Sequence, residues 1–214
     1  MNPNTAAVKS YFKGLMDLAI KLIAGPVDFF RNMPKNGGLL DPMLFLVTTV
    51  LLGVILIFAG SFVTHGTGVY GLGMLAISLI IMPLIAIILS FFVAGIFYVT
   101  WSFMGSNESY ETSYRCLAYT QILFPLMILL SIVPYLALLG IAWWFYLMVV
   151  ATREVHKAPA APAAAVFGAI AVLIGLVYYS SVSSTIKAKQ RLEEYTKELQ
   201  KAPAGNEKAD SGNR

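Results

Sequence analysis

The middle of this chain is almost free of charge over a length that no water-soluble fold can use. Between Pro42 and Thr152 the only formal charges are those of Glu108, Glu111 and Arg115. Charged residues make up 12% of the 214 residues and hydrophobic residues 58%, whereas soluble domains carry about 25% charged residues. The chain has too few polar side chains to cover the surface of a soluble protein. The sequence therefore predicts an all-α, polytopic membrane protein.

Apolar runs long enough to cross a bilayer recur through this region. A transmembrane helix needs about 20 residues, at about 1.5 Å each, to cross the ~30 Å hydrocarbon core. The second run is too short for two spans and a turn, so we predict one long tilted helix that Pro83 kinks. Pro125 lies inside the third span and Pro134 in the turn after it. We predict a membrane domain at 42–183 with five spans, at about 43–63, 72–104, 115–132, 135–152 and 163–182.

Residues 1–41 are predicted to form a cytosolic segment that begins with an amphipathic helix at 8–24. At 100° per residue its apolar side chains share one arc, and Ile20 is the one large exception. Lysines opposite this arc suit a helix in the headgroup plane; packing on a partner or on the membrane domain would give the same pattern. The residues predicted at the lipid interface are Lys9, Lys13, Lys21, Phe29, Phe30, Arg31, Lys35, Arg153 and Lys157.

The basic residues predict the orientation. Five lie in the N-terminal segment, one in the 105–115 loop and two in the 153–161 loop, whereas the two short outer loops have none. The positive-inside rule then places the N-terminus in the cytosol, and five spans place the C-terminus outside, against its seven basic residues. Residues 184–214 are predicted to continue as a charged helix and to end in a disordered tail. Basic residues that only flank the spans do not indicate nucleic-acid binding.

The charged stretch after the fourth span invites a catalytic or metal-binding interpretation. A metal site at Glu154 and His156 needs further ligands, and the other histidine, His65, is expected on the opposite membrane face. Catalysis would need a nucleophile and an oxyanion arrangement, and neither accompanies these residues. We therefore predict no catalytic, cofactor or metal site. The residues predicted to form a partner site or polar network are Glu108, Glu111, Arg115, Gln121, Glu154 and His156.

The stretch from "NESYETSYRCLAY" to "REVHKAPAAPAAAV" resembles the bacterial form of the Yip family, the Ypt/Rab-interacting membrane proteins. The similarity lies in the polar loop, the proline-bearing third span, the Gly-Ile-x-Trp of the fourth span and the "REVH" exit. The upstream "PVDFFRNMPKNGGLLDPMLF" resembles the family's pre-membrane segment, so the resemblance covers about residues 26–180. It implies five spans, a cytosolic N-terminus, a non-cytosolic C-terminus and no enzymatic activity. The N-terminal segment is shorter than those of eukaryotic members that contact Rab-type GTPases.

Three functions fit these features. The first is a non-enzymatic scaffold, membrane-organising or trafficking-related factor in the inner membrane of a prokaryote, acting through lipid and protein contacts. The second is a small-solute channel or permease built around Gln121, although no acidic residue inside a predicted span offers a coupling group. The third is a membrane subunit whose basic tail docks a larger complex. Rows of small residues in the second and fifth spans serve packing within the protein or in a homo-oligomer.

Overall fold

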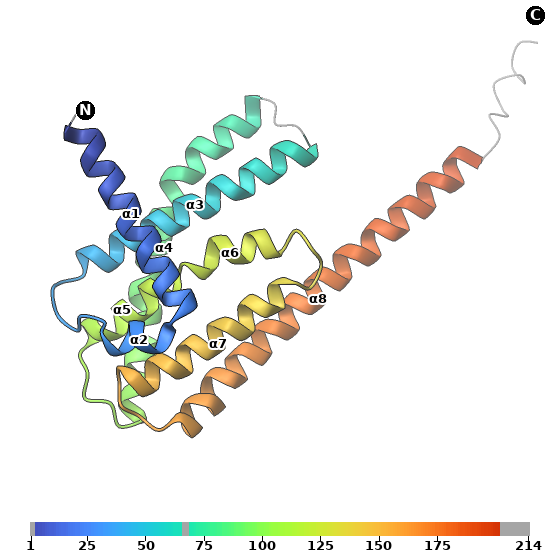
Figure 1. Ribbon diagram of the computed structural model, residues 1–214. Coiled ribbons are helices and arrows are strands. Elements are labelled where there is room, and N and C mark those ends of the chain that lie inside the picture. The colour runs from blue at the N-terminus through green and yellow to red at the C-terminus, as the bar shows by residue number, and fades with distance from the viewer. Residues whose placement is uncertain (1–2, 66–68, 202–214) are drawn as a thin grey trace, which may run out of the picture. The chain divides into compact units, whose positions relative to one another are not determined.

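A computed structural model describes residues 3–65 and 69–201, and within them it contains helices and no strands. The chain forms two compact units, residues 1–174 and 175–214. Helix α8 begins in the first unit, and its residues from Gly175 onward belong to the second. The helices are α1 (Pro3–Ala24), α2 (Pro26–Arg31), α3 (Leu40–His65), α4 (Val69–Phe103), α5 (Tyr110–Thr120), α6 (Leu123–Leu130), α7 (Ala137–Glu154) and α8 (Ala160–Lys201) (Figure 1).

Five helical stretches are long and apolar enough to cross a membrane, which confirms the prediction of an all-α, multi-pass protein. They are Leu40–Val63, Gly71–Phe103, Tyr110–Leu130, Ala137–Glu154 and Ala160–Leu199. The second is a single helix that continues through Pro83. At 35 residues, α4 is about 52 Å long, well beyond the ~30 Å hydrocarbon core.

The third span differs from the single helix expected, because it is divided into α5 and α6. The division lies at Gln121 and Ile122, and Gln121 stands four residues before Pro125. A proline has no N–H for the carbonyl four residues earlier, and its ring clashes with that carbonyl. The Gln121 carbonyl instead accepts from the Phe124 N–H at 2.9 Å, an i to i+3 bond that tightens the chain. Pro125 therefore breaks the helix at Gln121.

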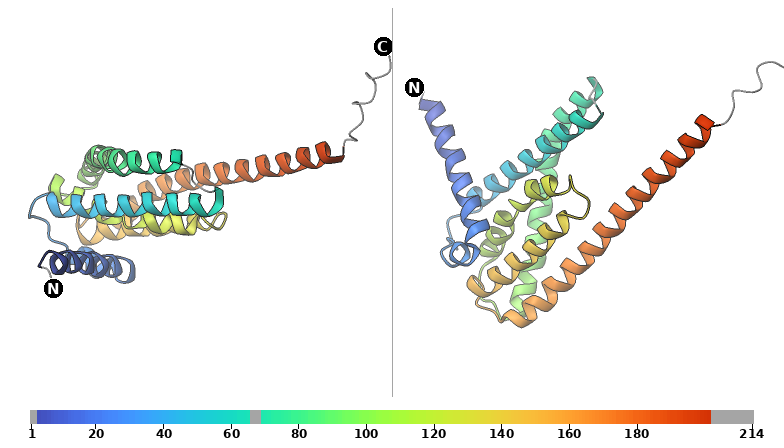
Figure 2. Two further views of the ribbon diagram at one scale, coloured as in Figure 1. Left: turned by 90° about the horizontal axis from the view of Figure 1, so that it is seen from above. Right: turned by 45° about the vertical axis from the view of Figure 1, so that its right-hand side comes forward.

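Two glycines allow helices of the first unit to approach closely. A Cβ on Gly140 of α7 would lie 2.7 Å from Cγ of Met127 on α6, and one on Gly53 of α3 would lie 2.3 Å from Cε1 of Phe124. Contacts this short exclude any larger side chain unless the neighbour moves. α6 and α7 lie side by side as a hairpin, as do α3 and α4, in both views of Figure 2. The turn of the α6–α7 hairpin includes Tyr135, with φ of 66°.

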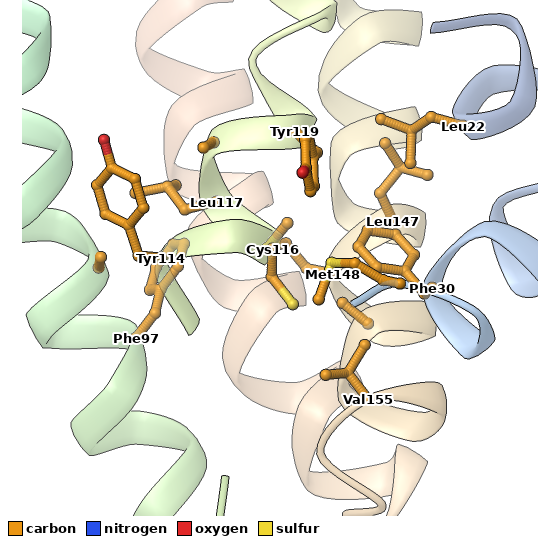
Figure 3. Packing of buried hydrophobic residues seen from close by; sticks show 14 of the residues in the cluster. Leu22, Phe30, Phe97, Tyr114, Cys116, Leu117, Tyr119, Leu147, Met148 and Val155 are labelled. Carbon is orange, nitrogen blue, oxygen red and sulfur yellow. The ribbon is translucent and has the colours of Figure 1, made fainter. Parts of the chain in front are cut away.

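The core of the first unit gathers around α5, in which every residue from Thr112 to Thr120 is buried. Side chains from α1, α2, α4 and α7 converge on this helix (Figure 3). Phe29 of α2 contacts Tyr119 edge to face with 5.5 Å between ring centroids, and Phe91 of α4 stacks on Tyr114 at 4.8 Å. α5 is therefore surrounded by protein over most of its length, and its polar residues must find partners within the fold.

Candidate functional site

The linker between α2 and α3 is held against the loops that precede α5 and follow α7. Arg31 Nε donates to Glu154 Oε2 at 3.0 Å, and Lys35 forms an ion pair with Glu108. Lys35 Nζ also lies 3.4 Å from the carbonyl oxygen of Val155. These pairs join residues 123 and 73 positions apart in the chain. We call this surface, made by the linker and the two loops, the ion-paired face.

A second set of bonds fixes the far end of the linker. The Gly38 N–H donates to Glu111 Oε1 at 2.8 Å, and Arg115 Nη2 donates to the Gly38 carbonyl at 2.6 Å. Arg115 Nε also pairs with Glu111 Oε1 at 3.2 Å, and the arginine side chain is only 3% exposed. Gly38 adopts φ of +83°, a conformation that favours glycine. The guanidinium thus bridges α5 and the linker where almost no water reaches it.

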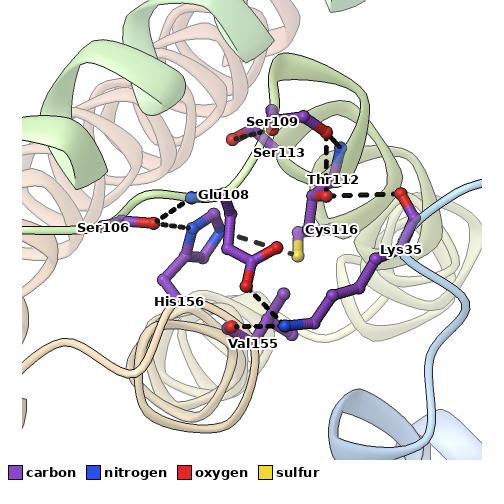
Figure 4. Close-up of polar contacts among 9 residues, drawn as sticks. All are labelled: Lys35, Ser106, Glu108, Ser109, Thr112, Ser113, Cys116, Val155 and His156. Atoms are coloured by element: carbon purple, nitrogen blue, oxygen red, sulfur yellow. Dashed lines mark hydrogen bonds and ion pairs between the residues drawn. The ribbon is translucent and has the colours of Figure 1, made fainter.

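Beneath the ion-paired face lies a histidine that makes polar contacts on both ring nitrogens (Figure 4). His156 Nδ1 lies 2.8 Å from Ser106 Oγ, and Nε2 lies 4.0 Å from the Sγ of Cys116. The imidazole also stacks on Trp101, with 3.9 Å between ring centroids. The indole N–H of Trp101 donates to Thr152 Oγ1 at 2.8 Å. These contacts join the loop that follows α7 to the C-terminal end of α4.

The environment of His156 favours the neutral imidazole. The residue is 3% exposed, and burial, followed by the nearby positive charge of Lys35, lowers its pKa to about 3. Ser106 Oγ accepts from the Glu108 N–H, so its own proton is free to donate to Nδ1. The Nε2–H then faces the sulfur. A neutral, fully partnered histidine is suited to holding structure rather than to exchanging protons at neutral pH.

Acid is therefore expected to destabilise the protein through His156. The unfolded chain takes up a proton near pH 6.5 and the folded chain only near pH 3. Stability is full above about pH 6.5 and falls as the pH drops toward 3, by at most about 1.4 kcal/mol per pH unit. Thermal unfolding in detergent at pH 7.5 and pH 5.0 measures this loss. The variant His156→Gln should lose less stability over the same interval, and an equal loss in both proteins would contradict the assignment.

The N-terminal helix buries one edge of its apolar arc and exposes the other. Leu22 and Ala19 are 0% and 8% exposed and pack on the core, whereas Met16, Ile20 and Ile23 are 61%, 57% and 37% exposed. Lys9, Lys13 and Lys21 are exposed. Ile20, the exception to the sequence pattern, belongs to the exposed part. The predicted helix thus has two apolar surfaces, one of which is already occupied by the protein.

Several residues predicted at the lipid interface have protein partners. Phe30 lies in the hydrophobic core at 1% exposure, because α2 packs against α7 and α1, and Phe29 is half-buried against Tyr119. Arg31 and Lys35 carry the ion pairs described above. Arg153 and Lys157 are exposed, and their contact with headgroups stays a prediction.

The predicted polar network is divided into several groups. Glu108 and Glu154 lie on the ion-paired face. Glu111 and Arg115 of α5 hold the far end of the linker, His156 lies beneath the face, and Gln121 is apart, at the helix break. No pattern in the sequence indicates Ser106, Trp101 or Thr152 as partners of this network. Only the folded chain brings Ser106 and Trp101 to the histidine and Thr152 to Trp101.

Within the described residues, no group of three histidine, cysteine or carboxylate side chains is placed to hold a metal ion. Two nucleophile types approach the imidazole of His156: the Ser106 hydroxyl at 2.8 Å and the Cys116 sulfur at 4.0 Å. All three side chains are buried, so a substrate would have to displace the packing around them, including the Trp101 stack, to reach them. The geometry describes a structural junction between loops.

Comparison with known proteins agrees with the resemblance noted in the sequence. The family model for the Yip1 domain matches residues 20–182, which include α2 to α7, most of the fifth span and the whole ion-paired face. No curated protein and no solved structure matches the chain. The matched region covers well over half of the 214 residues. The chain is a member of the Yip1 family of multi-pass membrane proteins.

Proposed function

We propose that this protein is a non-enzymatic membrane scaffold or organising factor, of a trafficking-related type, that acts through lipid and protein contacts. The observation that carries the proposal is the exposed apolar strip of α1, formed by Met16, Ile20 and Ile23. Membership in a family of non-catalytic membrane proteins supports the absence of an enzymatic role.

The strip has the composition of a surface that contacts a bilayer. Lys9 precedes Met16 by seven residues and Lys13 precedes Ile20 by seven, so each lysine lies two turns from an exposed apolar side chain on the same face. Apolar side chains bordered by lysines suit the boundary between headgroups and acyl chains of an anionic membrane. Because Leu22 and Ala19 anchor the helix to the core, any bending or crowding force on α1 would be transmitted to the membrane domain.

The ion-paired face restrains the segment of chain that follows α1. Arg31 and Lys35 hold the linker that joins α2 to the first span, so α1 is not a free tether. In this proposal that face and the N-terminus are cytosolic, the C-terminus lies on the other side and the membrane is the inner membrane of a prokaryote. The basic residues of the N-terminal segment support this orientation.

The variant Ile20→Glu tests the proposal. A carboxylate in the exposed strip is expected to remove the lipid contact without disturbing the core, because Ile20 is 57% exposed. Hydrogen exchange of residues 9–24 in anionic nanodiscs should increase severalfold, and anionic vesicles that the wild type deforms should keep the diameter of protein-free vesicles in electron micrographs.

The matched control is Ser10→Glu, which adds the same charge to an exposed position on the polar arc of the same helix. It should behave as the wild type. Wild-type protein that leaves vesicle diameter unchanged, or an Ile20→Glu variant as effective as the wild type, would count against the scaffold function.

A further inference from the structure

A cavity of about 400 Å³ lies between α3, α4 and the α5–α6 break. Its lining contains no charged residue, and nearly all of it is aliphatic or aromatic. Along α3 it extends from Leu46 to Phe58, twelve residues or about 18 Å. An acyl chain covers about half of the ~30 Å hydrocarbon core. The cavity is therefore about as long as one lipid chain.

The lining of this cavity holds three polar side chains, those of Ser78, Ser90 and Gln121, and Gln121 is the only amide among them. Gln121 lines the cavity and is half-buried, and no hydrogen bond joins its amide group to any residue within 3–65 or 69–201. Ser90, a second polar residue in the lining, is satisfied, because its Oγ lies 2.7 Å from the Ile87 carbonyl and 3.2 Å from the Tyr114 hydroxyl. An unpaired amide at membrane depth is costly, and this indicates that Gln121 binds a polar group from outside the chain.

Neighbouring contacts locate Gln121 along the cavity. Tyr119 packs on Phe45 with 5.4 Å between ring centroids, and Phe124 lies against Gly53. Gln121 comes between Tyr119 and Phe124 in the chain, so it lies beside the part of α3 from Phe45 to Gly53. The polar group would therefore be held in the half of the cavity that starts at Leu46, and the remainder, which is mostly aliphatic or aromatic, extends toward Phe58.

We propose that this cavity binds a neutral acyl lipid, with one acyl chain between α3 and α4 and an ester carbonyl that accepts a hydrogen bond from the Gln121 amide. Leu46 lies six residues, about 9 Å, inside the span that begins at Leu40. A charged headgroup at this depth would lack any counter-charge in the lining. An uncharged acylglycerol fits both the chain-shaped space and the single amide.

The lipid has a way in from the bilayer. Ile57, Ile85 and Leu89 line the cavity and are 46%, 44% and 56% exposed. The cavity thus opens sideways between α3 and α4, and a second acyl chain can stay in the surrounding membrane. This site is separate from the strip on α1, so it does not depend on the proposed scaffold function.

Native mass spectrometry of the full chain in a mild detergent tests the site, with diacylglycerol, its dialkyl ether analogue and phosphatidylethanolamine as probes. Diacylglycerol should bind about threefold to tenfold more tightly than the ether analogue, because the ether lacks the carbonyl that accepts the hydrogen bond. It should also bind more tightly than phosphatidylethanolamine. In Gln121→Leu the difference between ester and ether should disappear.

Filling the cavity should weaken the binding of diacylglycerol and of its ether analogue. Ala86→Phe places a ring in the lining and should weaken binding about tenfold or more, since it excludes several methylene groups of the chain. Ala76→Phe is the matched control, because Ala76 is exposed on α4 outside the cavity. Equal binding by Ala86→Phe and Ala76→Phe, equal affinity for ester and ether in the wild type, or a preference for phosphatidylethanolamine would overturn the proposal. If Ala86→Phe does not fold, the ester and ether comparison in Gln121→Leu decides.

Discussion

Replacing Arg115 with methionine is expected to lower the free energy of unfolding by about 3 kcal/mol. Removing one partner of a buried ion pair costs about 3–5 kcal/mol because the other charge is left without compensation. The lower end applies here, since Glu111 keeps 29% exposure and can recover some water. The Gly38 carbonyl loses its 2.6 Å donor in the same step, so the loss falls on the linker as well as on α5.

Thermal unfolding in detergent measures the stability of this variant, and trypsin reports the linker directly. Cleavage after Lys35 should become faster in Arg115→Met well below the unfolding temperature, because Gly38 is released. Arg153→Met is the control: Arg153 is exposed, and its loss should change stability by no more than about 0.5 kcal/mol. Wild-type stability in Arg115→Met would show that the guanidinium does not hold the linker.

Trp101→Ala is expected to cost about 3–5 kcal/mol, the range for deleting a buried aromatic side chain. Trp101 is 0% exposed and lies between the His156 ring and the side chains of Phe97 and Phe167. Its deletion leaves a cavity at the point where α4, α8 and the loop after α7 meet. Equilibrium unfolding by guanidinium or heat in detergent gives the size of the loss.

Phenylalanine at the same position separates packing from hydrogen bonding. Trp101→Phe keeps an aromatic face on His156 but removes the N–H that Thr152 accepts, so it should cost about 1 kcal/mol from the lost bond. Trp143→Phe is the matched comparison, because the buried Trp143 Nε1 has no hydrogen-bond partner among the described residues. It should lose less than Trp101→Phe. The reverse order would contradict the role given to the Trp101–Thr152 bond.

The number of helices able to cross a membrane could be predicted because lipid imposes a simple rule. In hydrocarbon the backbone must make its hydrogen bonds within the segment, which requires a helix long enough to cross the core. Each such helix is visible in the sequence as an apolar run. The break at Gln121 is equally local, since it follows from Pro125 four residues later, but the sequence alone does not decide between a kink and a division into two helices. Neither does it separate the two apolar surfaces of α1, because both Leu22 and Met16 belong to the same amphipathic arc.

The candidate site was less predictable. Arg31 and Lys35 carry the pattern of headgroup anchors, and the fold instead gives them Glu154 and Glu108 as partners. Pairs separated by so much chain depend on how the helices pack, which no local pattern encodes. His156 was identifiable as a polar residue at a span exit, whereas its burial depends on Trp101, which is brought to it from another helix.

The burial of α5 has a consequence for how the chain enters the membrane during synthesis. The third and fourth spans are the least apolar of the five and also the most enclosed by protein. A segment that carries Glu111 and Arg115 gains little from lipid by itself when the insertion machinery releases it. Contacts with neighbouring helices hold this segment in the bilayer, and α3 and α4 are synthesised before it. We therefore expect an ordered biogenesis, in which the hairpin of α3 and α4 inserts through its own hydrophobicity and then packs against the later, more polar spans.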